Sequence, residues 1–338
     1  MNQTPAPGTA AAAAGTTTAP GNLGADRITA TVLSQINGPD PRINQLARSL
    51  VSHLHDFIRQ NQVSWDEWMT GLDFLTRVGH WTSEARNEFI LMSDTSGCST
   101  LVDALNNAGP ANMTPTTVEG PFHSEAPARQ MGEIIATDKQ WASGDWTLMH
   151  GKVLDTDGRP LGGARIDIWQ ADQAGLYDVQ DDEMQAGDLR ALLTTAADGS
   201  YWFRTVRPCS YPVPTDGPGG EWLRAAGRQP MRPAHIHVRV DAEGCRPLIT
   251  HLFVAGDPYL DIDAAFGVRE GLVLDFQVQD DPVQIQANGM PGPYFDVTYD
   301  LVLVPAGWAM DPGDVVSVEI DGLGSVTNPI TSRSQETT

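Results

Sequence analysis

The hydrophobic pattern of this chain changes once along its length, and that change limits the folds open to it. Through residues 26–107 the apolar side chains recur at steps of three and four, the spacing of one face of an α-helix. From Gly132 onward apolar and polar residues alternate instead, the spacing of a half-buried β-strand. Helices followed by many short strands predict a mainly β chain with an N-terminal helical domain.

The helical segment contains several start signals. Pro41 suits the first turn of a helix whose stripe is Ile43, Leu46, Leu50, Leu54, Phe57 and Ile58. Ser64 and Glu67 form a capping box for a second helix, Thr82 caps a third at about 83–94, and a short fourth covers 100–107. From physics alone, these stripes can pack on a partner molecule or on a sheet of the same subunit.

The second segment predicts a β-sandwich. Asp157-Gly158 and Asp198-Gly199 are dipeptides typical of hairpin turns, and short alternating runs flank them. Residues 208–232 are rich in proline and glycine without clear periodicity, which predicts a functional loop. We therefore expect a disordered tail (1–25), a helical domain (26–110), a β-sandwich domain (111–306) and a C-terminal tail (307–338), in which 315–320 can form one more strand.

The net charge and the cysteine content limit the kinds of molecule that this chain is expected to bind and the compartment in which it is expected to work. The chain has 21 Lys and Arg against 43 Asp and Glu, a net charge of −22, which disfavours nucleic acid and anionic membranes. No apolar run approaches the roughly 20 residues of a membrane-spanning helix. Cys98, Cys209 and Cys245 show no metal-binding or disulfide spacing, and no secretion signal is evident. We expect a cytoplasmic protein.

The stretch Arg232-Pro-Ala-His235-Ile-His237-Val-Arg-Val240 reads as a strand with two histidines on one face, about 7 Å apart. Two imidazoles on one face can share a metal ion, although a strand can also carry two histidines without one. Tyr177 and Tyr211, two of only six tyrosines, stand upstream in turn-rich contexts. Phenolate oxygens together with imidazoles suit ferric iron better than zinc or copper, since a trivalent cation favours the ionised phenol.

The order Tyr177, Tyr211, His235, His237, with Arg232 three residues before the first histidine, resembles the intradiol ring-cleavage dioxygenases. The segments Gly175–Asp178, Tyr211–Pro218, Arg232–His237 and Thr250–Asp257 are most similar to the hydroxyquinol 1,2-dioxygenase branch, and the resemblance runs from about residue 26 to about residue 306. It implies Fe(3+) bound by these tyrosines and histidines, with O2 and a small aromatic diol or triol as substrates.

The resemblance also implies roles. Tyr177 and His235 are equatorial ligands, and Tyr211 and His237 are axial. Tyr211 leaves the metal and accepts a substrate proton, while Arg232 stabilises negative charge on the ring unless it only pairs with a surface carboxylate. His251 stands sixteen residues after His235, where the catechol branch usually has glutamine. We expect a catalytic role beside the ligands for His251, the alternative being a histidine that only packs.

By the same resemblance, the substrate pocket draws on nine residues: Leu91, Asp94, Val118, Gly120, Pro121, Phe122, Val213, Pro214 and Ala265. Asp94 is expected to hydrogen-bond the third hydroxyl of hydroxyquinol. If Glu119 also lines the pocket, it should disfavour chlorinated catechols.

The leading hypothesis is cleavage of hydroxyquinol (1,2,4-trihydroxybenzene) to 3-hydroxy-cis,cis-muconate, the tautomer of maleylacetate. The alternatives are a catechol or substituted-catechol 1,2-dioxygenase and a non-catalytic β-sandwich binding module. The resemblance further implies a homodimer that forms through the N-terminal helices and encloses a lipid-like molecule.

Overall fold

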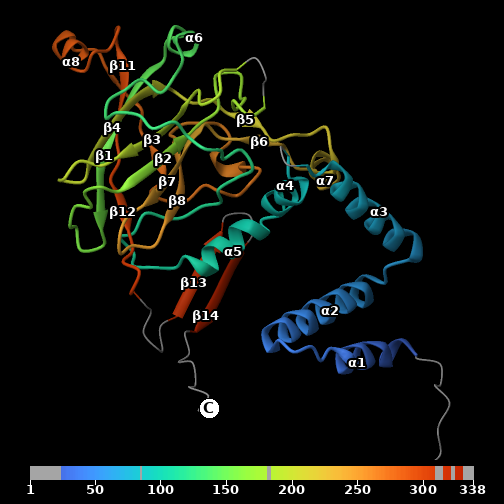
Figure 1. Cartoon of the computed structure of the whole chain (residues 1–338). Helices are drawn as coiled ribbons and strands as arrows, with labels where there is room; N and C mark the ends of the chain where they lie inside the picture. Colours follow the sequence, from blue (N-terminus) through green and yellow to red (C-terminus); the bar gives the residue numbers. More distant parts are fainter. Residues whose placement is uncertain (1–23, 84–85, 181–183, 309–314, 321–323, 330–338) are drawn as a thin grey trace, which may run out of the picture. The chain divides into compact units, whose positions relative to one another are not determined.

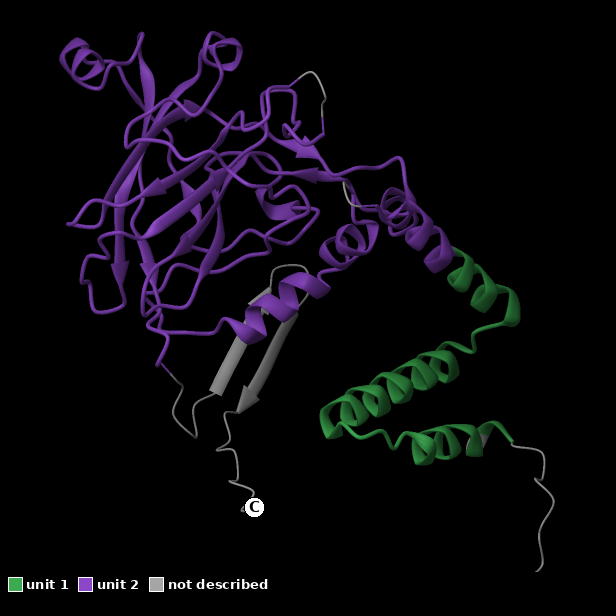
Figure 2. Cartoon of the chain, in the orientation of Figure 1, with its two compact units in different colours: residues 1–73 green, residues 74–338 purple. Residues whose placement is uncertain are grey.

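Figure 1 shows a computed structural model that describes residues 24–83, 86–180, 184–308, 315–320 and 324–329. The chain forms two compact units, residues 1–73 and 74–338 (Figure 2). The predicted disordered tail lies almost wholly outside the described residues. Among the residues that are described, no helix combines the length and apolarity needed to cross a bilayer.

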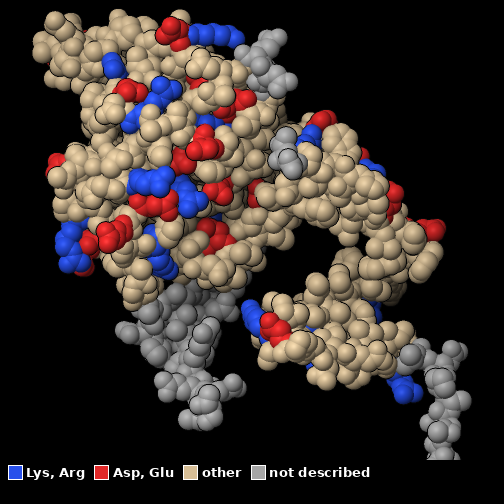
Figure 3. Space-filling view, viewed as in Figure 1, with Lys and Arg blue, Asp and Glu red and all other residues tan. Residues whose placement is uncertain are grey.

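The first unit contains α1 (Ala25–Gln35), α2 (Pro41–Asn61) and the beginning of α3 (Trp65–Trp81). Helix α2 begins at Pro41, as predicted, because the Asp40 carboxylate accepts hydrogen bonds from the amides of Arg42 (2.7 Å) and Ile43 (3.1 Å). Within this chain the apolar stripe of α2 is largely exposed, and Figure 3 shows few charged side chains over these helices.

Two helix starts illustrate how capping decides boundaries. The capping box is confirmed, since the Ser64 amide donates to the Glu67 carboxylate at 2.8 Å. The predicted third helix was placed too early: α4 runs from Glu88 to Thr95 and is capped by Asn87. The Thr82 hydroxyl cannot cap it because it donates to the Val78 carbonyl at 3.0 Å, at the end of α3. The predicted fourth helix is α5 (Cys98–Asn106).

The second unit is built on two facing sheets. One has the order β3-β2-β7-β8-β9, and the other β10-β11-β1-β12 with β4 also paired to β1. Ile166 and Ile236 of the first sheet and Phe203 and Val297 of the second are buried in one core, which confirms the β-sandwich. The strands are β1 (Trp146–Asp155), β2 (Arg165–Trp169), β3 (Arg190–Thr194), β4 (Ser200–Val206), β7 (His235–Asp241), β8 (Leu248–Val254), β9 (Val273–Leu274), β10 (Gln277–Gln279), β11 (Tyr294–Thr298) and β12 (Leu301–Leu303).

The two Asp-Gly turns form, with Gly158 and Gly199 at φ +79° and +77°, but the strands beside them do not form hairpins. Each turn carries the chain from one sheet to the other: β1 and β4 lie in one sheet, and β2 and β3 in the other. A dipeptide determines a local turn, whereas burial of the apolar faces decides which strands pair.

The segment 208–232 contains more structure than predicted. Its ends pair as β5 (Tyr211–Pro212) and β6 (Met231–Arg232), and α7 (Pro218–Ala225) lies between them. The predicted C-terminal strand is confirmed as β13 (Val315–Ile320), paired with β14 (Gly324–Pro329). The remaining elements are α6 (Asp138–Trp141), η1 (Leu260–Ile262) and α8 (Pro282–Ala287).

Candidate metal centre and active site

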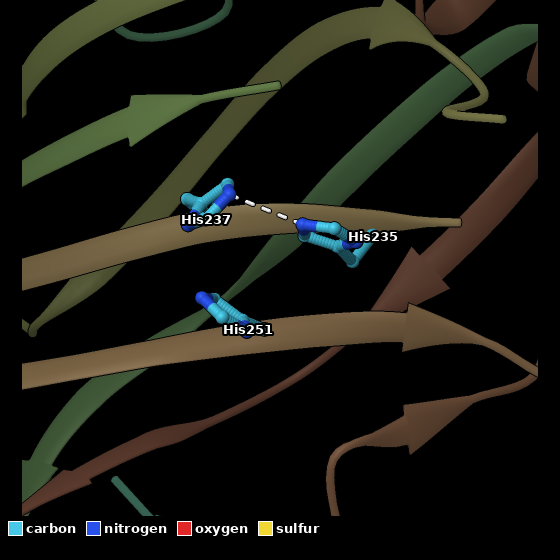
Figure 4. Close-up of side chains that lie close together, drawn as sticks. All are labelled: His235, His237 and His251. Atoms are coloured by element: carbon cyan, nitrogen blue, oxygen red, sulfur yellow. Dashed lines mark hydrogen bonds between the residues drawn. The ribbon is translucent and has the colours of Figure 1, made fainter. Parts of the chain in front are cut away.

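Strand β7 brings two histidines together. His235 and His237 share one face of the strand, while Ile236 and Val238 on the other face enter the core. Both histidines are buried, and their Nε2 atoms lie 3.1 Å apart (Figure 4). His235 Nδ1 lies 2.6 Å from the Pro233 carbonyl, which can only accept a hydrogen bond. That nitrogen therefore carries the proton, and Nε2 presents a lone pair.

Two tyrosines complete a ring of four donor atoms. Tyr177 Oη lies 2.8 Å from Tyr211 Oη and 3.0 Å from His237 Nε2, and Tyr211 Oη lies 3.4 Å from His235 Nε2. Ligands about 2 Å from a common ion, separated by coordination angles near 90–120°, are about 2.8–3.5 Å apart. The four-donor ring (Tyr177, Tyr211, His235 and His237) therefore has the size of a single coordination sphere.

The approach of the two tyrosines depends on a glycine. Gly175 has a φ of +82°, and a Cβ placed there would lie 2.5 Å from the Cβ of Tyr211. A side chain at this position would push Tyr211 away from Tyr177 and open the ring. This is the physical reason for glycine in the turn before Tyr177.

Burial controls protonation of the ring. Burial raises the pKa of the Tyr177 phenol well above its ordinary value near 10, and the neighbouring Tyr211 raises it further. Burial also raises the pKa of Tyr211. Burial lowers the pKa of His235 to about 3 and lowers that of His237 as well. The metal-free ring is therefore neutral, and a bound cation of high charge is what would convert the phenols to phenolates.

Arg232 is held beside the ring by a buried carboxylate. Strand β6 places Arg232 opposite Tyr211, and Asp263 accepts from Arg232 Nε at 3.1 Å and Nη2 at 3.3 Å. Asp263 also accepts from the amides of Ala265 (3.2 Å) and Gly267 (2.8 Å). Burial opposes ionisation of Asp263, but the Arg232 guanidinium and these amides outweigh it and lower the pKa of the carboxyl. The partner of Arg232 is thus internal rather than a surface carboxylate.

His251 lies on β8 opposite His237 and forms a histidine trio with it and His235 (Figure 4). One ligand nitrogen from each of the three lies within 4.8 Å of the others. However, each tyrosine oxygen lies within 3.4 Å of His235 Nε2 or His237 Nε2, whereas His251 Nδ1 lies 3.2 Å from Arg232 Nη2. The four-donor ring is therefore the tighter metal set, and Arg232 contacts both His251 and the ring, since its Nη1 lies 3.4 Å from His235 Nε2.

The residues predicted to line the pocket fall into two groups. Leu91 and Val213 are buried in one apolar cluster. Burial raises the pKa of Asp94, on the same helix as Leu91, and a hydrogen bond with the Ser99 side chain and the nearby Arg232 cation only partly oppose this. Ala265 is buried in the loop that follows Asp263. Pro214 is half-buried next to Val213.

The second group is the loop 118–122. Phe122 stacks on Tyr177 with ring centroids 5.0 Å apart, and a Cβ on Gly120 would lie 3.5 Å from His237 Cε1. The backbone of Val118 lies beside His251, and Pro121 is half-buried. The loop therefore borders the ring on the β7 side. Glu119 is partly exposed and faces Arg239 Nη1 at 3.4 Å, so an ion pair with β7 accounts for it without a place in the pocket.

Comparison with known proteins bears on this arrangement. The family model described as "Dioxygenase" matches residues 118–305, and the one described as "Catechol dioxygenase N terminus" matches residues 40–114. The chain belongs to the intradiol ring-cleavage dioxygenase family. Members of this family are metal-dependent dioxygenases that cleave aromatic rings. Among the described residues, the four-donor ring provides donor atoms that can bind such a metal.

Curated relatives of this dioxygenase include a hydroxyquinol 1,2-dioxygenase from Rhizobium sp. (strain MTP-10005), 44% identical over 82% of this chain and 95% of the relative. A catechol 1,2-dioxygenase from Candida albicans is 40% identical over 72% of this chain and 82% of the relative. Among solved structures, the hydroxyquinol 1,2-dioxygenase of Pseudomonas putida DLL-E4 has a TM-score of 0.76 and 42% identity, covering 83% of this chain and 98% of that one.

Sequence reasoning missed several residues that orient the dioxygenase site. Asp263, the partner of Arg232, follows no periodic pattern and was not singled out. Asp257 accepts from the Ser210 hydroxyl and from the Ala234 amide at 3.0 Å, and so fixes the segments that precede Tyr211 and His235. Its only signal was its place at the end of the quoted segment Thr250–Asp257. Trp169, the last residue of β2, also belongs to this group, because its ring stacks on His237 with centroids 4.8 Å apart.

Proposed function

We propose that this dioxygenase cleaves hydroxyquinol between its vicinal hydroxyls with O2 to give 3-hydroxy-cis,cis-muconate, the tautomer of maleylacetate, using ferric iron. The observation that carries the proposal is the buried ring formed by Tyr177, Tyr211, His235 and His237, whose neighbouring donor atoms are 2.8–3.4 Å apart. Several relatives named hydroxyquinol 1,2-dioxygenase, at 44–45% identity, support the choice of substrate.

The four-donor ring fits ferric iron by its chemistry as well as its size. Two hard phenolate oxygens and two imidazoles favour a trivalent ion, and a cation of high charge would oppose the burial that raises the pKa values of both tyrosines. When bound, the iron would supply Lewis acidity toward the vicinal hydroxyls of the substrate.

The residues of the chain itself would then carry two tasks. Tyr211 would accept a proton from a substrate hydroxyl, because its oxygen is a member of the ring and would be basic as phenolate. Arg232 would stabilise the negative charge that develops on the substrate ring, since Asp263 fixes its guanidinium in a buried environment where such charges interact strongly. His251, in contact with Arg232, would help to orient that guanidinium.

Substrate selection is proposed to rest on the pocket residues given above. Asp94 is the decisive one, because its carboxyl is buried near Arg232 and its raised pKa reflects an environment short of water. A ring hydroxyl that hydrogen-bonds this carboxyl would offset the cost of burying it. Leu91, Val118, Gly120, Pro121, Phe122, Val213, Pro214 and Ala265 would shape the remaining wall. A catechol lacks the third hydroxyl and would leave the Asp94 carboxyl with the Ser99 side chain but without a partner from the substrate.

Domain organisation and assembly belong to the same proposal. Residues 26–110 would form the dimerisation domain, supported by the exposed apolar stripe of α2 and by the family model that ends at residue 114, and residues 111–306 the catalytic domain. The stripe would be covered by a second copy of the chain together with a lipid-like molecule. Residues 1–25 and 307–338 would be tails. Three free cysteines are consistent with a reducing, cytoplasmic setting.

Oxygen uptake by the purified, iron-loaded protein tests the proposal. Hydroxyquinol should give a higher kcat/KM than catechol, and the protein should be wine-red from charge transfer between tyrosinate and iron. A higher kcat/KM for catechol would favour the catechol 1,2-dioxygenase alternative. A colourless iron-loaded protein would contradict the two-tyrosine centre.

A further inference from the structure

Helix α4 carries Leu91 and Asp94, and one side chain attaches its C-terminal turn to the loop that positions Arg232. Arg228 follows α7, and its Nη1 donates to the carbonyl of Thr95, the last residue of α4. Its Nη2 donates to the Ala264 carbonyl at 3.0 Å. The positive charge also suits the negative end of the α4 dipole. Arg228 therefore bridges the helix that carries Asp94 and the loop 263–267.

The loop that Arg228 contacts contains one residue in an unfavourable backbone conformation. Phe266 has a φ of +55°, in the left-handed region that bulky side chains rarely adopt. The Arg228 guanidinium lies 4.2 Å from the centroid of the Phe266 ring, and the Phe266 amide donates to the Asp263 carbonyl at 3.1 Å. Such a conformation persists where surrounding contacts over-determine it. Arg228 supplies one of these contacts and joins it to α4.

Other contacts hold the loop, and the end of α4 also contacts α5, where Ser99 Oγ donates to Ser93 Oγ at 2.8 Å. Thr100 on α5 donates to the Ala265 carbonyl at 2.9 Å, and the Asp263 carboxylate binds the amides of Ala265 and Gly267. Without Arg228 these bonds would keep Asp263, and with it Arg232, close to the metal centre. The last turn of α4, which carries Asp94, would lose the Arg228 bridge to the loop and would be able to shift relative to Arg232 while it stays attached to α5.

We propose that Arg228 is a positioning residue for substrate selectivity: it sets the separation between the Asp94 carboxyl and Arg232, and so the fit of a third ring hydroxyl. This rests on the proposed cleavage of hydroxyquinol. Arg228 contacts neither the four-donor ring nor the expected position of the vicinal hydroxyls. Its influence should therefore appear in the binding of triols and leave the binding of diols almost unchanged.

The test compares iron-loaded wild type with Arg228→Met, which keeps an unbranched apolar stem but removes the guanidinium with its hydrogen bonds and charge. We expect KM for hydroxyquinol to rise about tenfold while KM for catechol changes less than about twofold. The reason is that the variant loses only the interaction with the third hydroxyl, which stabilises the bound substrate and the transition state equally. The visible charge-transfer band should be unchanged.

Arg246→Met is the matched control. Arg246 also donates to a backbone carbonyl, that of Ala108 at 3.1 Å, and lies 5.4 Å from the centroid of an aromatic ring, that of Trp308. It has no contact with α4 or the loop 263–267 among those described. Its loss should leave the hydroxyquinol-to-catechol ratio of kcat/KM at the wild-type value, which separates the geometry of α4 from the general effect of losing an arginine.

Arg228→Lys keeps the experiment decisive if the methionine variant does not fold. A lysine keeps the charge and reaches one carbonyl, so KM for hydroxyquinol should rise about threefold with KM for catechol unchanged. Equal changes for both substrates, or no change for either, would overturn the assignment. If wild type does not cleave hydroxyquinol, the proposed function itself fails; wild-type selectivity in a folded Arg228 variant overturns the role of Arg228 alone.

Discussion

Replacing Asp263 with asparagine tests how much the orientation of Arg232 contributes. The carboxylate accepts two hydrogen bonds from Arg232, at 3.1 and 3.3 Å, and two from backbone amides, at 3.2 and 2.8 Å. Asparagine keeps Oδ1 but places an NH2 group where Oδ2 faces Arg232 Nη2 and the Gly267 amide. Two acceptor bonds become donor–donor contacts, and Arg232 stays buried without a counter-charge. Breaking a buried pair in this way costs about 3–5 kcal/mol.

We therefore expect Asp263→Asn to lower the free energy of unfolding by about 3 kcal/mol and to reduce kcat by about 10–100-fold, with the visible band retained. Urea unfolding and oxygen uptake on the iron-loaded protein measure both quantities. Asp261→Asn is the control, since Asp261 is an exposed residue of η1 two positions away. Wild-type turnover in a folded Asp263→Asn protein would show that Arg232 needs no carboxylate to act, and the reasoning would be wrong.

Three further predictions follow from the metal centre. Tyr211→Phe should bind iron more weakly, shift the visible band and lose at least about 100-fold in kcat, because it removes both a donor atom and the proton acceptor; wild-type turnover would contradict the role of Tyr211. Arg232→Ala should keep the band but lose kcat, and should also unfold at lower urea because Asp263 is left as an unpaired buried charge; full activity would remove Arg232 from the mechanism. In the metal-free protein, the free energy of unfolding should fall as pH drops from about 6.5 toward about 3, because burial lowers the pKa values of His235, His237 and His251, so only the unfolded chain takes up protons there. A urea midpoint that does not change between about pH 7 and about pH 5 would contradict this last prediction.

Much of the fold was predictable because it depends on local pattern. The change of periodicity separated helices from strands, and the alternation around His235 and His237 placed both imidazoles on one face of β7. The pairing of the strands was harder to predict from the sequence. The Asp-Gly turns are local, but their flanking strands belong to opposite sheets, and that outcome depends on which apolar faces bury each other across the whole domain.

Helix α7 shows why the segment 208–232 was misread. Its first turn contains Pro218, Gly219 and Gly220, and the two glycines have low helix propensity. The carboxylate of Glu88, 131 residues earlier, accepts from the Gly219 amide at 2.7 Å and supplies the missing cap. A capping group so distant in sequence leaves no local signal.

By itself the sequence determined the two classes of structure, the face shared by the two histidines and, through resemblance, the identity and order of the proposed ligands. Only the tertiary structure decided that four donor atoms meet within 2.8–3.4 Å and that Asp263, Asp257 and Arg228 support the site. The physical reason is that periodicity records which way a side chain faces along its own element. The distance between atoms on different elements is determined by packing between segments far apart in the chain.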